Sequence, residues 1–238
     1  MKRLQKPRFL FVYPLVVWLF LVARISKRTL RWGGLIILIG EVLRCWANGY
    51  VGTMKVNETT ADGRRPKIGR LITGGPYAYV RHPLYLGTLL IGMGFCVVVG
   101  NPWALLVTLA GFLLIYRAKM ASEEETIRHE WGAAFARYQQ AVPRWLPGWR
   151  RYADRYGRWT WAGIAASKEW KTLAWLIIAL IALYLREEVI QEGEALLGEP
   201  KHVLLLGVAA ALLAADGVAE LLRRWKRSDA PPSTAVTG

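Results

Sequence analysis

The feature that most constrains this chain is a series of long apolar stretches joined by polar connections. A helix needs about 20 mostly apolar residues to cross the roughly 30 Å hydrocarbon core of a bilayer. With 54% hydrophobic residues among 238, the chain predicts an all-α fold, an integral membrane helical bundle of about six transmembrane helices. We expect these spans at 9–24, 32–48, 84–100, 102–118, 172–186 and 203–222.

Basic residues are concentrated in the connections between these stretches. A formal net charge of +15 would favour nucleic acid for a soluble protein, but here anionic membrane lipids are the expected partner and nucleic acid is not. Lys and Arg are enriched in 49–83, 117–171 and the tail, which we therefore expect on the cytoplasmic side together with both termini. The acidic connection 187–201 is expected on the opposite side, and the basic turn 24–31 violates the pattern. Compact size and the lack of a cleavable signal suggest a prokaryotic inner membrane.

Two polar features lie inside the apolar stretches. Glu41 and Arg44 are costly in lipid unless paired, and three residues apart they share a helix face, so we expect them to form a pair. Cys45 and Cys96 have no ligand-like neighbours. We therefore expect neither a disulfide framework nor a metal site.

Residues 71–87 read LITGGPYAYVRHPLYLG and combine polar groups with the start of an apolar helix. Pro83 suits a first helical position, and it forces His82 into an extended conformation at the helix N-terminus, where the helix dipole favours anionic groups. Tyr85 lies one turn further along. After the apolar hairpin returns, Arg117, Lys119 and Glu123 recur at near-helical spacing and offer both charge signs to a zwitterionic ligand.

The pattern T-G-x-P-Y-x-Y-x-R-H-P-x-Y-x-G, followed by E-E, W-G and V-P-x-x-L-P, resembles the isoprenylcysteine carboxyl methyltransferase family. Phospholipid N-methyltransferases share much of the pattern. The resemblance runs from about Gly69 to Pro147. It implies a methyltransferase that uses S-adenosyl-L-methionine, in a pocket open to the cytosol, to methylate a lipophilic or lipid acceptor.

The same resemblance implies roles for particular residues. The cofactor pocket would be formed by Gly69, Arg70, Leu71, Ile72, Tyr77, His82, Pro83, Leu84, Tyr85 and Glu123. In the family, an arginine four positions before that glutamate addresses the substrate. Here Lys119 takes this catalytic position, with Arg117 two residues earlier. Lysine keeps the positive charge but lacks the planar fork that grips a carboxylate through two hydrogen bonds.

The apolar stretches, together with the resemblance over Gly69 to Pro147, divide the chain into segments. We expect a two-span hairpin at 1–48, a catalytic core at 49–147, an interfacial segment at 148–171, a second hairpin at 172–222 and a basic, disordered tail at 223–238. Within 149–159, aromatic residues recur every three or four positions between arginines. This spacing predicts an amphipathic helix in the headgroup layer.

Several functions remain open at this point. Carboxylate O-methylation is slightly favoured over methylation of a phospholipid amine. A carboxylate needs no general base at neutral pH, whereas an amine must first lose a proton. Sterol reductases that use NADPH resemble the same region, and a lipid-binding protein without catalytic activity would retain the fold. Methyl transfer from a sulfonium needs positioning rather than a protein nucleophile, so the lack of a Ser/His/Asp arrangement is expected.

Overall fold

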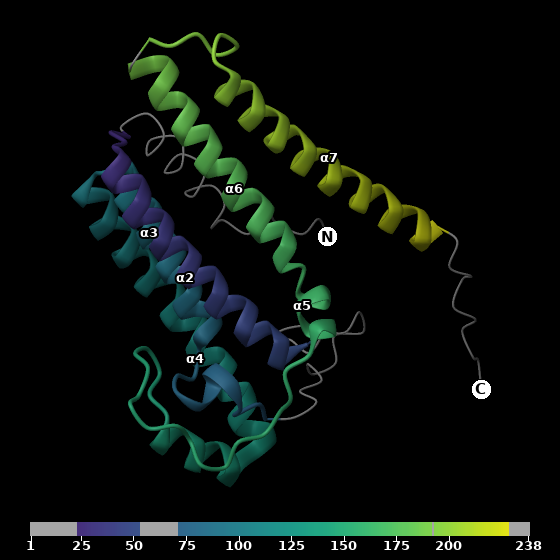
Figure 1. Cartoon of the computed structure of the whole chain (residues 1–238). Coiled ribbons are helices and arrows are strands. Elements are labelled where there is room, and N and C mark those ends of the chain that lie inside the picture. The colour runs from purple at the N-terminus through teal and green to yellow at the C-terminus, as the bar shows by residue number, and fades with distance from the viewer. Residues whose placement is uncertain (1–22, 53–70, 192, 229–238) are drawn as a thin grey trace, which may run out of the picture. The chain divides into compact units, whose positions relative to one another are not determined.

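The computed structural model describes residues 23–52, 71–191 and 193–228. These residues form helices and no strand (Figure 1). The α-helices are α2 (Lys27–Val51), α3 (Pro83–Val99), α4 (Pro102–Ala141), α5 (Trp161–Ser167), α6 (Glu169–Arg186) and α7 (Pro200–Ser228), with a 3-10 turn η1 (Gly75–Ala78) and a π turn η2 (Glu187–Gln191). The chain divides into two compact units, Met1–Glu169 and Trp170–Gly238.

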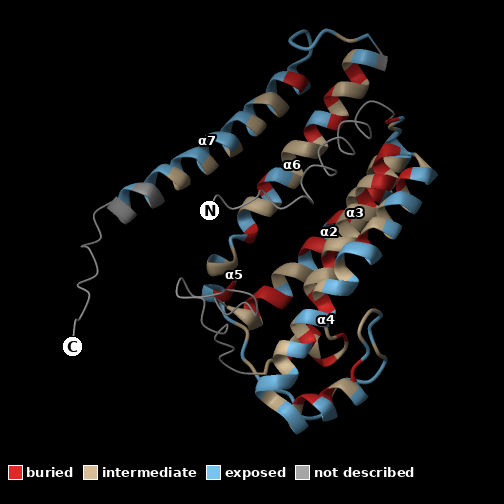
Figure 2. Ribbon diagram, turned by 180° about the vertical axis from the view of Figure 1, so that it is seen from behind, coloured by how far each residue is buried: buried red, intermediate tan, exposed pale blue. Residues whose placement is uncertain are grey.

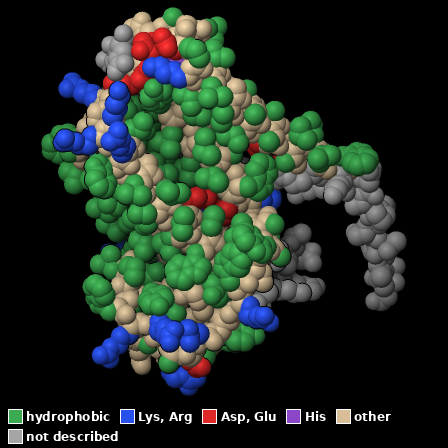
Figure 3. Space-filling view, in the orientation of Figure 1, with side chains coloured by type: hydrophobic (Ala, Val, Ile, Leu, Met, Phe, Trp, Pro, Cys, Tyr) green, Lys and Arg blue, Asp and Glu red, His purple; other side chains and the backbone are tan. Residues whose placement is uncertain are grey.

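Three helices in the described residues are long and apolar enough to cross a membrane: α2, α4 and the Pro200–Leu222 part of α7. Helix α3 is apolar but shorter, at 17 residues. Hydrophobic side chains cover much of the visible face (Figure 3), and Leu114 on α4 is 79% exposed. Hydrocarbon contact explains such exposure. The prediction of an all-α integral membrane protein is confirmed.

Five of the six expected spans coincide with helices, namely α2, α3, α4, α6 and α7. The expected span 9–24 lies almost entirely outside the described residues. The predicted start of the disordered tail at residue 223 is wrong, because helix α7 continues to Ser228. Residues 229–238 lie outside the described part of the chain.

Helices α2 and α3 pack closely because glycines face each other across their contact. A Cβ atom added to Gly40 would lie 2.7 Å from the carbonyl oxygen of Gly87, and one added to Gly33 would lie 2.6 Å from that of Gly94. Small residues allow backbones of membrane helices to approach this closely. Figure 2 shows buried residues gathered where the two helices meet.

The polar side chains of α2 are paired with a residue distant in sequence. Arg44 donates from Nη2 to Glu169 Oε1 at 2.9 Å, and Asn48 Nδ2 donates to the same oxygen at 2.7 Å. The expected pair of Glu41 and Arg44 is present at 3.7 Å, but Glu169 is the closer partner. This network joins α2 to Glu169 and pairs the charge of Arg44, which would otherwise be costly in an apolar environment.

Helix α4 is longer than one membrane crossing requires. Asn101 caps it by accepting a hydrogen bond from Trp103 N at 2.9 Å, and Pro102 occupies the first helical position. The helix then runs for 40 residues, with a break at Gly132, where φ is 40°. The expected span 102–118 is therefore only the first part of α4, and the later turns carry the acidic residues.

The prediction of an amphipathic helix at 149–159 is wrong. These residues form an irregular segment that pairs with the loop before α3. Thr73 N donates to Tyr156 O at 3.1 Å, and Tyr152 N donates to Ala78 O at 2.8 Å. The backbone groups of this segment form hydrogen bonds with the loop before α3 instead of with one another along a helix. The regular spacing of its aromatic residues therefore does not indicate a helix.

Candidate active site

The loop that precedes α3 is fixed by hydrogen bonds to the segment that follows α4. The hydroxyl of the buried Thr73 donates to Asp154 O at 2.8 Å. Arg81 N donates to Pro143 O at 2.9 Å. These bonds hold the start of α3 against the loop 142–148, so that side chains from both segments converge.

His82 lies between two carboxylates at the start of α3. Pro83 occupies the first helical position, as predicted, and His82 is the N-cap residue. The extended conformation expected for His82 is wrong, because its ψ is 62° with φ at −124°. The imidazole is buried, with Nε2 3.0 Å from Glu124 Oε1 and Nδ1 3.9 Å from Glu123 Oε2. The histidine therefore links the N-terminus of α3 to the middle of α4.

Glu124 is the buried centre of this cluster. Its carboxylate accepts hydrogen bonds from Arg81 Nη1 at 2.9 Å, from Gln139 Nε2 at 3.1 Å and from Arg144 Nε at 3.1 Å. Arg144 also donates to the second carboxylate oxygen. Such charge-assisted bonds are the strongest hydrogen bonds of proteins, and they satisfy the buried charge. Burial lowers the pKa of Arg81, and the nearby Glu124 carboxylate opposes this effect.

Glu123, the acidic residue expected in the cofactor pocket, is less buried than Glu124 and faces a different group. It accepts a hydrogen bond from the Tyr85 hydroxyl. The structure thus brings together the predicted residues His82, Tyr85 and Glu123. The pocket residues assigned from the resemblance did not include Arg81, Glu124, Gln139 and Arg144, which the structure adds to the cluster. Arg144 comes directly after Val142-Pro143. A basic side chain just past the end of a helix can turn back toward an acidic side chain of that helix, and this was the signal available in the sequence.

The other predicted residues lie at varying distances from this cluster. Pro83 is buried and Leu84 half-buried in the first turn of α3. Lys119 Nζ lies 5.3 Å from the centre of the Tyr85 ring, a cation–π contact, whereas the Arg117 side chain is exposed. Gly69 and Arg70 fall outside the described residues.

Three predicted residues belong to the supporting loop. Leu71 packs against the small buried core of Phe135, Tyr138 and Val142, which gives it a packing role, and Ile72 is half-buried. Tyr138 donates from its hydroxyl to Tyr77 O at 2.7 Å. Burial raises the pKa of Tyr77, so its phenol stays protonated at neutral pH.

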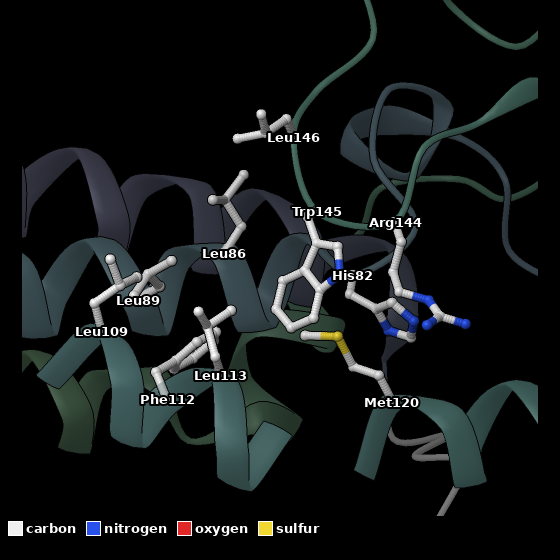
Figure 4. A pocket seen from close by; sticks show the side chains of 10 residues that line it. All are labelled: His82, Leu86, Leu89, Leu109, Phe112, Leu113, Met120, Arg144, Trp145 and Leu146. Carbon is white, nitrogen blue, oxygen red and sulfur yellow. The ribbon is translucent and has the colours of Figure 1, made fainter. Parts of the chain in front are cut away.

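A cavity of about 240 Å³ begins at His82 and extends along α3 and α4 (Figure 4). Figure 4 shows His82 and Arg144 at one end and Leu89 and Leu109 at the other, with Trp145 between them. The lining residues are His82, Leu86, Leu89, Leu109, Phe112, Leu113, Met120, Arg144, Trp145 and Leu146. The cavity is therefore polar at one end and apolar along the rest of its length.

The comparisons with known proteins cover the segment that contains His82, Glu123 and Glu124. A family model described as phospholipid methyltransferase matches residues 29–134. Protein-S-isoprenylcysteine O-methyltransferase from Xenopus laevis is 31% identical over 116 residues, which cover 48% of this chain and 39% of that protein. The protein of the same name from Rattus norvegicus is 30% identical over 115 residues, covering 48% and 40%.

A bacterial relative has a different kind of name. The cobalt-zinc-cadmium resistance protein of Cupriavidus metallidurans is 28% identical over 137 residues, 58% of this chain and 56% of that protein. The chain spans less than two thirds of the length of each of these three relatives. Residues 29–134, which contain α3 and the carboxylates of α4, thus carry the phospholipid methyltransferase pattern and resemble the isoprenylcysteine O-methyltransferases, as the motif predicted.

Proposed function

We propose that this protein is a membrane methyltransferase that transfers a methyl group from S-adenosyl-L-methionine to the carboxylate of a lipophilic acceptor. The observation that carries the proposal is the cavity whose polar end is formed by His82 and Arg144 and whose remaining length is apolar. Such a cavity suits a molecule with an anionic head and a hydrocarbon tail. Relatives named O-methyltransferases support the reaction type.

The cluster beside the cavity fits the methyl donor in its chemistry. S-adenosyl-L-methionine carries a sulfonium, an ammonium and a carboxylate, so its site needs both charge signs. Glu123 and Tyr85 supply a carboxylate and a hydroxyl next to His82, and the α3 N-terminus favours an anionic group. We assign cofactor binding to these residues with Pro83, Leu84 and Tyr77; Gly69 and Arg70 are proposed contacts outside the described residues.

Arg144 is our proposed contact for the acceptor head. Two of its N–H groups bind Glu124, and a guanidinium has five N–H groups, so others remain for a carboxylate. Arg144 therefore offers, at the mouth of the cavity, the planar set of N–H donors that Lys119 lacks. Lys119, beside the Tyr85 ring, contributes positive charge near the reacting groups. We place the exposed Arg117 side chain in the headgroup layer as part of this proposal.

Catalysis in this proposal rests on positioning. The sulfonium supplies an activated methyl group, and the protein aligns the acceptor oxygen with it and excludes water. Arg81, Gln139 and Arg144 hold Glu124, and Glu124 in turn faces the His82 imidazole. The apolar wall formed by Phe112, Trp145 and the leucines fixes the tail of the acceptor.

Methylation of a phospholipid amine is a second candidate, favoured by the phospholipid methyltransferase model and by one feature of the site. An amine must lose a proton before it attacks, and His82, between two carboxylates, offers a base for that proton. We propose for both candidates that the loops 71–82 and 142–160 face the cytoplasm of a prokaryotic inner membrane, because these connections are basic.

The test uses purified protein in nanodiscs of its native lipids with S-adenosyl-L-methionine labelled at the methyl group. We expect label in the lipid fraction, released as methanol by mild base because a methyl ester is base-labile. Label that resists mild base would identify the amine as the acceptor. Neither transfer nor binding of S-adenosyl-L-methionine, together with binding of NADPH, would contradict both candidates.

A further inference from the structure

The end of α6 and the start of α7 bring together three side chains that the proposed methyl transfer does not use. Glu188, Glu194 and His202 each offer one ligand atom, and these atoms all lie within 4.8 Å of one another. His202 Nε2 is 3.6 Å from Glu188 Oε2 and 3.4 Å from Glu194 Oε2. Ligands bound to Zn²⁺ at about 2.0–2.2 Å in a tetrahedral site lie roughly 3.3–3.6 Å apart. The spacing matches ligands that share one ion.

The imidazole of His202 is the decisive member of this group. Its side chain is 0% exposed, and Nδ1 lies 3.3 Å from Ala195 O. A carbonyl oxygen only accepts hydrogen bonds, so Nδ1 carries a proton and Nε2 is the ring nitrogen that faces the two carboxylates. Within the described residues, Nε2 has no hydrogen-bond partner. An unprotonated Nε2 that faces two carboxylates is repelled by them unless a positive charge, either a proton or a metal ion, lies between the three groups.

The surrounding groups prepare the carboxylates for a cation. Lys201 pairs with Glu188 and lies 3.0 Å from Glu194 Oε2. The Lys201 side chain is 43% exposed, which allows it to withdraw into water when an ion arrives. Glu194 N also donates to Glu188 O at 3.0 Å and holds the turn closed.

We propose that Glu188, Glu194 and His202 form a binding site for a divalent transition-metal ion, with Zn²⁺ as the best match. One imidazole and two carboxylates are ligands that Zn²⁺ accepts, and an open fourth position is filled by water. The contact from Nδ1 to Ala195 O is the outer hydrogen bond that orients a metal-binding histidine. No metal site was expected from the sequence, because Cys45 and Cys96 have no ligand-like neighbours.

The proposal is tested on the full chain purified without a polyhistidine tag, stripped with a chelator and then equilibrated with Zn²⁺. We expect about one Zn²⁺ per chain by elemental analysis. His202→Ala and Glu188→Gln should each weaken Zn²⁺ binding about 100-fold or more in competition with a chelating dye. Glu199→Gln in the same turn and His129→Ala on the exposed surface of α4 are matched controls, expected to bind Zn²⁺ as the unmodified chain does.

Lys201→Met separates a metal site from a purely structural ion cluster. Because the ammonium competes with the metal for both carboxylates, its removal should tighten Zn²⁺ binding, and added Zn²⁺ should raise the melting temperature of this variant. A chain that binds no Zn²⁺, or a His202→Ala variant with unchanged affinity, would overturn the proposal. So would a Lys201→Met variant that loses stability and gains nothing from Zn²⁺.

Discussion

Arg144 donates hydrogen bonds to both carboxylate oxygens of Glu124, and in this way it ties the loop after α4 back onto the middle of the same helix. The carboxylate sits in a buried position, while the guanidinium is partly exposed at the cavity mouth. One residue of the pair therefore supports the fold, and the other is available to a ligand. This division of roles leads to separate expectations for the two side chains.

Glu124→Gln should destabilise the protein. The change leaves Arg81 and Arg144 without their shared counter-charge, which we expect to cost about 2–4 kcal/mol of unfolding free energy. Glu125→Gln is the matched control, because Glu125 is exposed and its pair with Arg128 contributes no more than about 1 kcal/mol. Unfolding in mixed micelles by circular dichroism measures both. Equal stability of the two variants would show that Glu124 is not a structural centre.

Arg144→Lys should lower activity on the acceptor without changing affinity for the methyl donor. Lysine keeps the charge but not the planar fork, so we expect kcat/KM for a carboxylate acceptor to fall about 10-fold or more. Lys119→Ala should also depress turnover and spare cofactor affinity. Initial rates with labelled S-adenosyl-L-methionine give the acceptor parameters. A loss confined to cofactor binding would move Arg144 from the acceptor to the cofactor.

His82→Ala and Glu123→Gln should weaken binding of S-adenosyl-L-methionine. Each change removes one polar contact beside the N-terminus of α3, and a charged hydrogen bond is worth about 1.5–3 kcal/mol, or roughly 10-fold or more in affinity. Titration calorimetry with the purified variants checks this. Unchanged affinity in both variants would place the cofactor elsewhere.

Leu113→Trp should block the cavity. Leu113 lines it on α4, and a larger side chain there should raise KM for acceptors with long hydrocarbon tails while short acceptors are affected less. Leu114→Trp on the same helix is the control, since Leu114 is exposed outside the cavity and should behave like the unmodified enzyme. If the two variants discriminate against long tails equally, the tail does not occupy this cavity.

Gly40→Ala should disturb the contact of α2 with α3. The new methyl group would lie 2.7 Å from the Gly87 carbonyl oxygen, and such overpacking costs about 1–3 kcal/mol. Gly34→Ala, with nothing within 4 Å of the added atom, should be neutral or slightly stabilising. Melting temperatures in detergent distinguish the two variants. A Gly40→Ala variant as stable as Gly34→Ala would contradict the close contact.

Much of the fold could be predicted because its signals are local. Apolar stretches are long enough to identify the membrane helices, and Asn101-Pro102 and His82-Pro83 mark helix starts through capping and proline chemistry. The segment 149–159 could not be predicted in this way. Its backbone partners are Thr73 and Ala78, far away in sequence, and aromatic periodicity does not report them.

The residues of the candidate site could be predicted only in part, again because some of their contacts join segments that are far apart in sequence. The sequence indicates that acidic residues of α4 meet His82, but adjacent residues on a helix point about 100° apart. Whether Glu123 or Glu124 is buried depends on the rotation of α4, which packing decides. The three ligand atoms at the α6–α7 turn depend in the same way on a loop closure that no local pattern encodes.

Helix α4 is uninterrupted from Phe112, in the wall of the cavity, to Glu124, with its break only later at Gly132. The apolar wall of the cavity and the carboxylates beside its polar end are thus parts of one continuous helix. A bilayer of different thickness that tilts this helix would displace both by a common motion. If the proposed methyl transfer is correct, the choice of acceptor tail and the alignment of the reacting atoms are linked through this helix to the lipid around the protein.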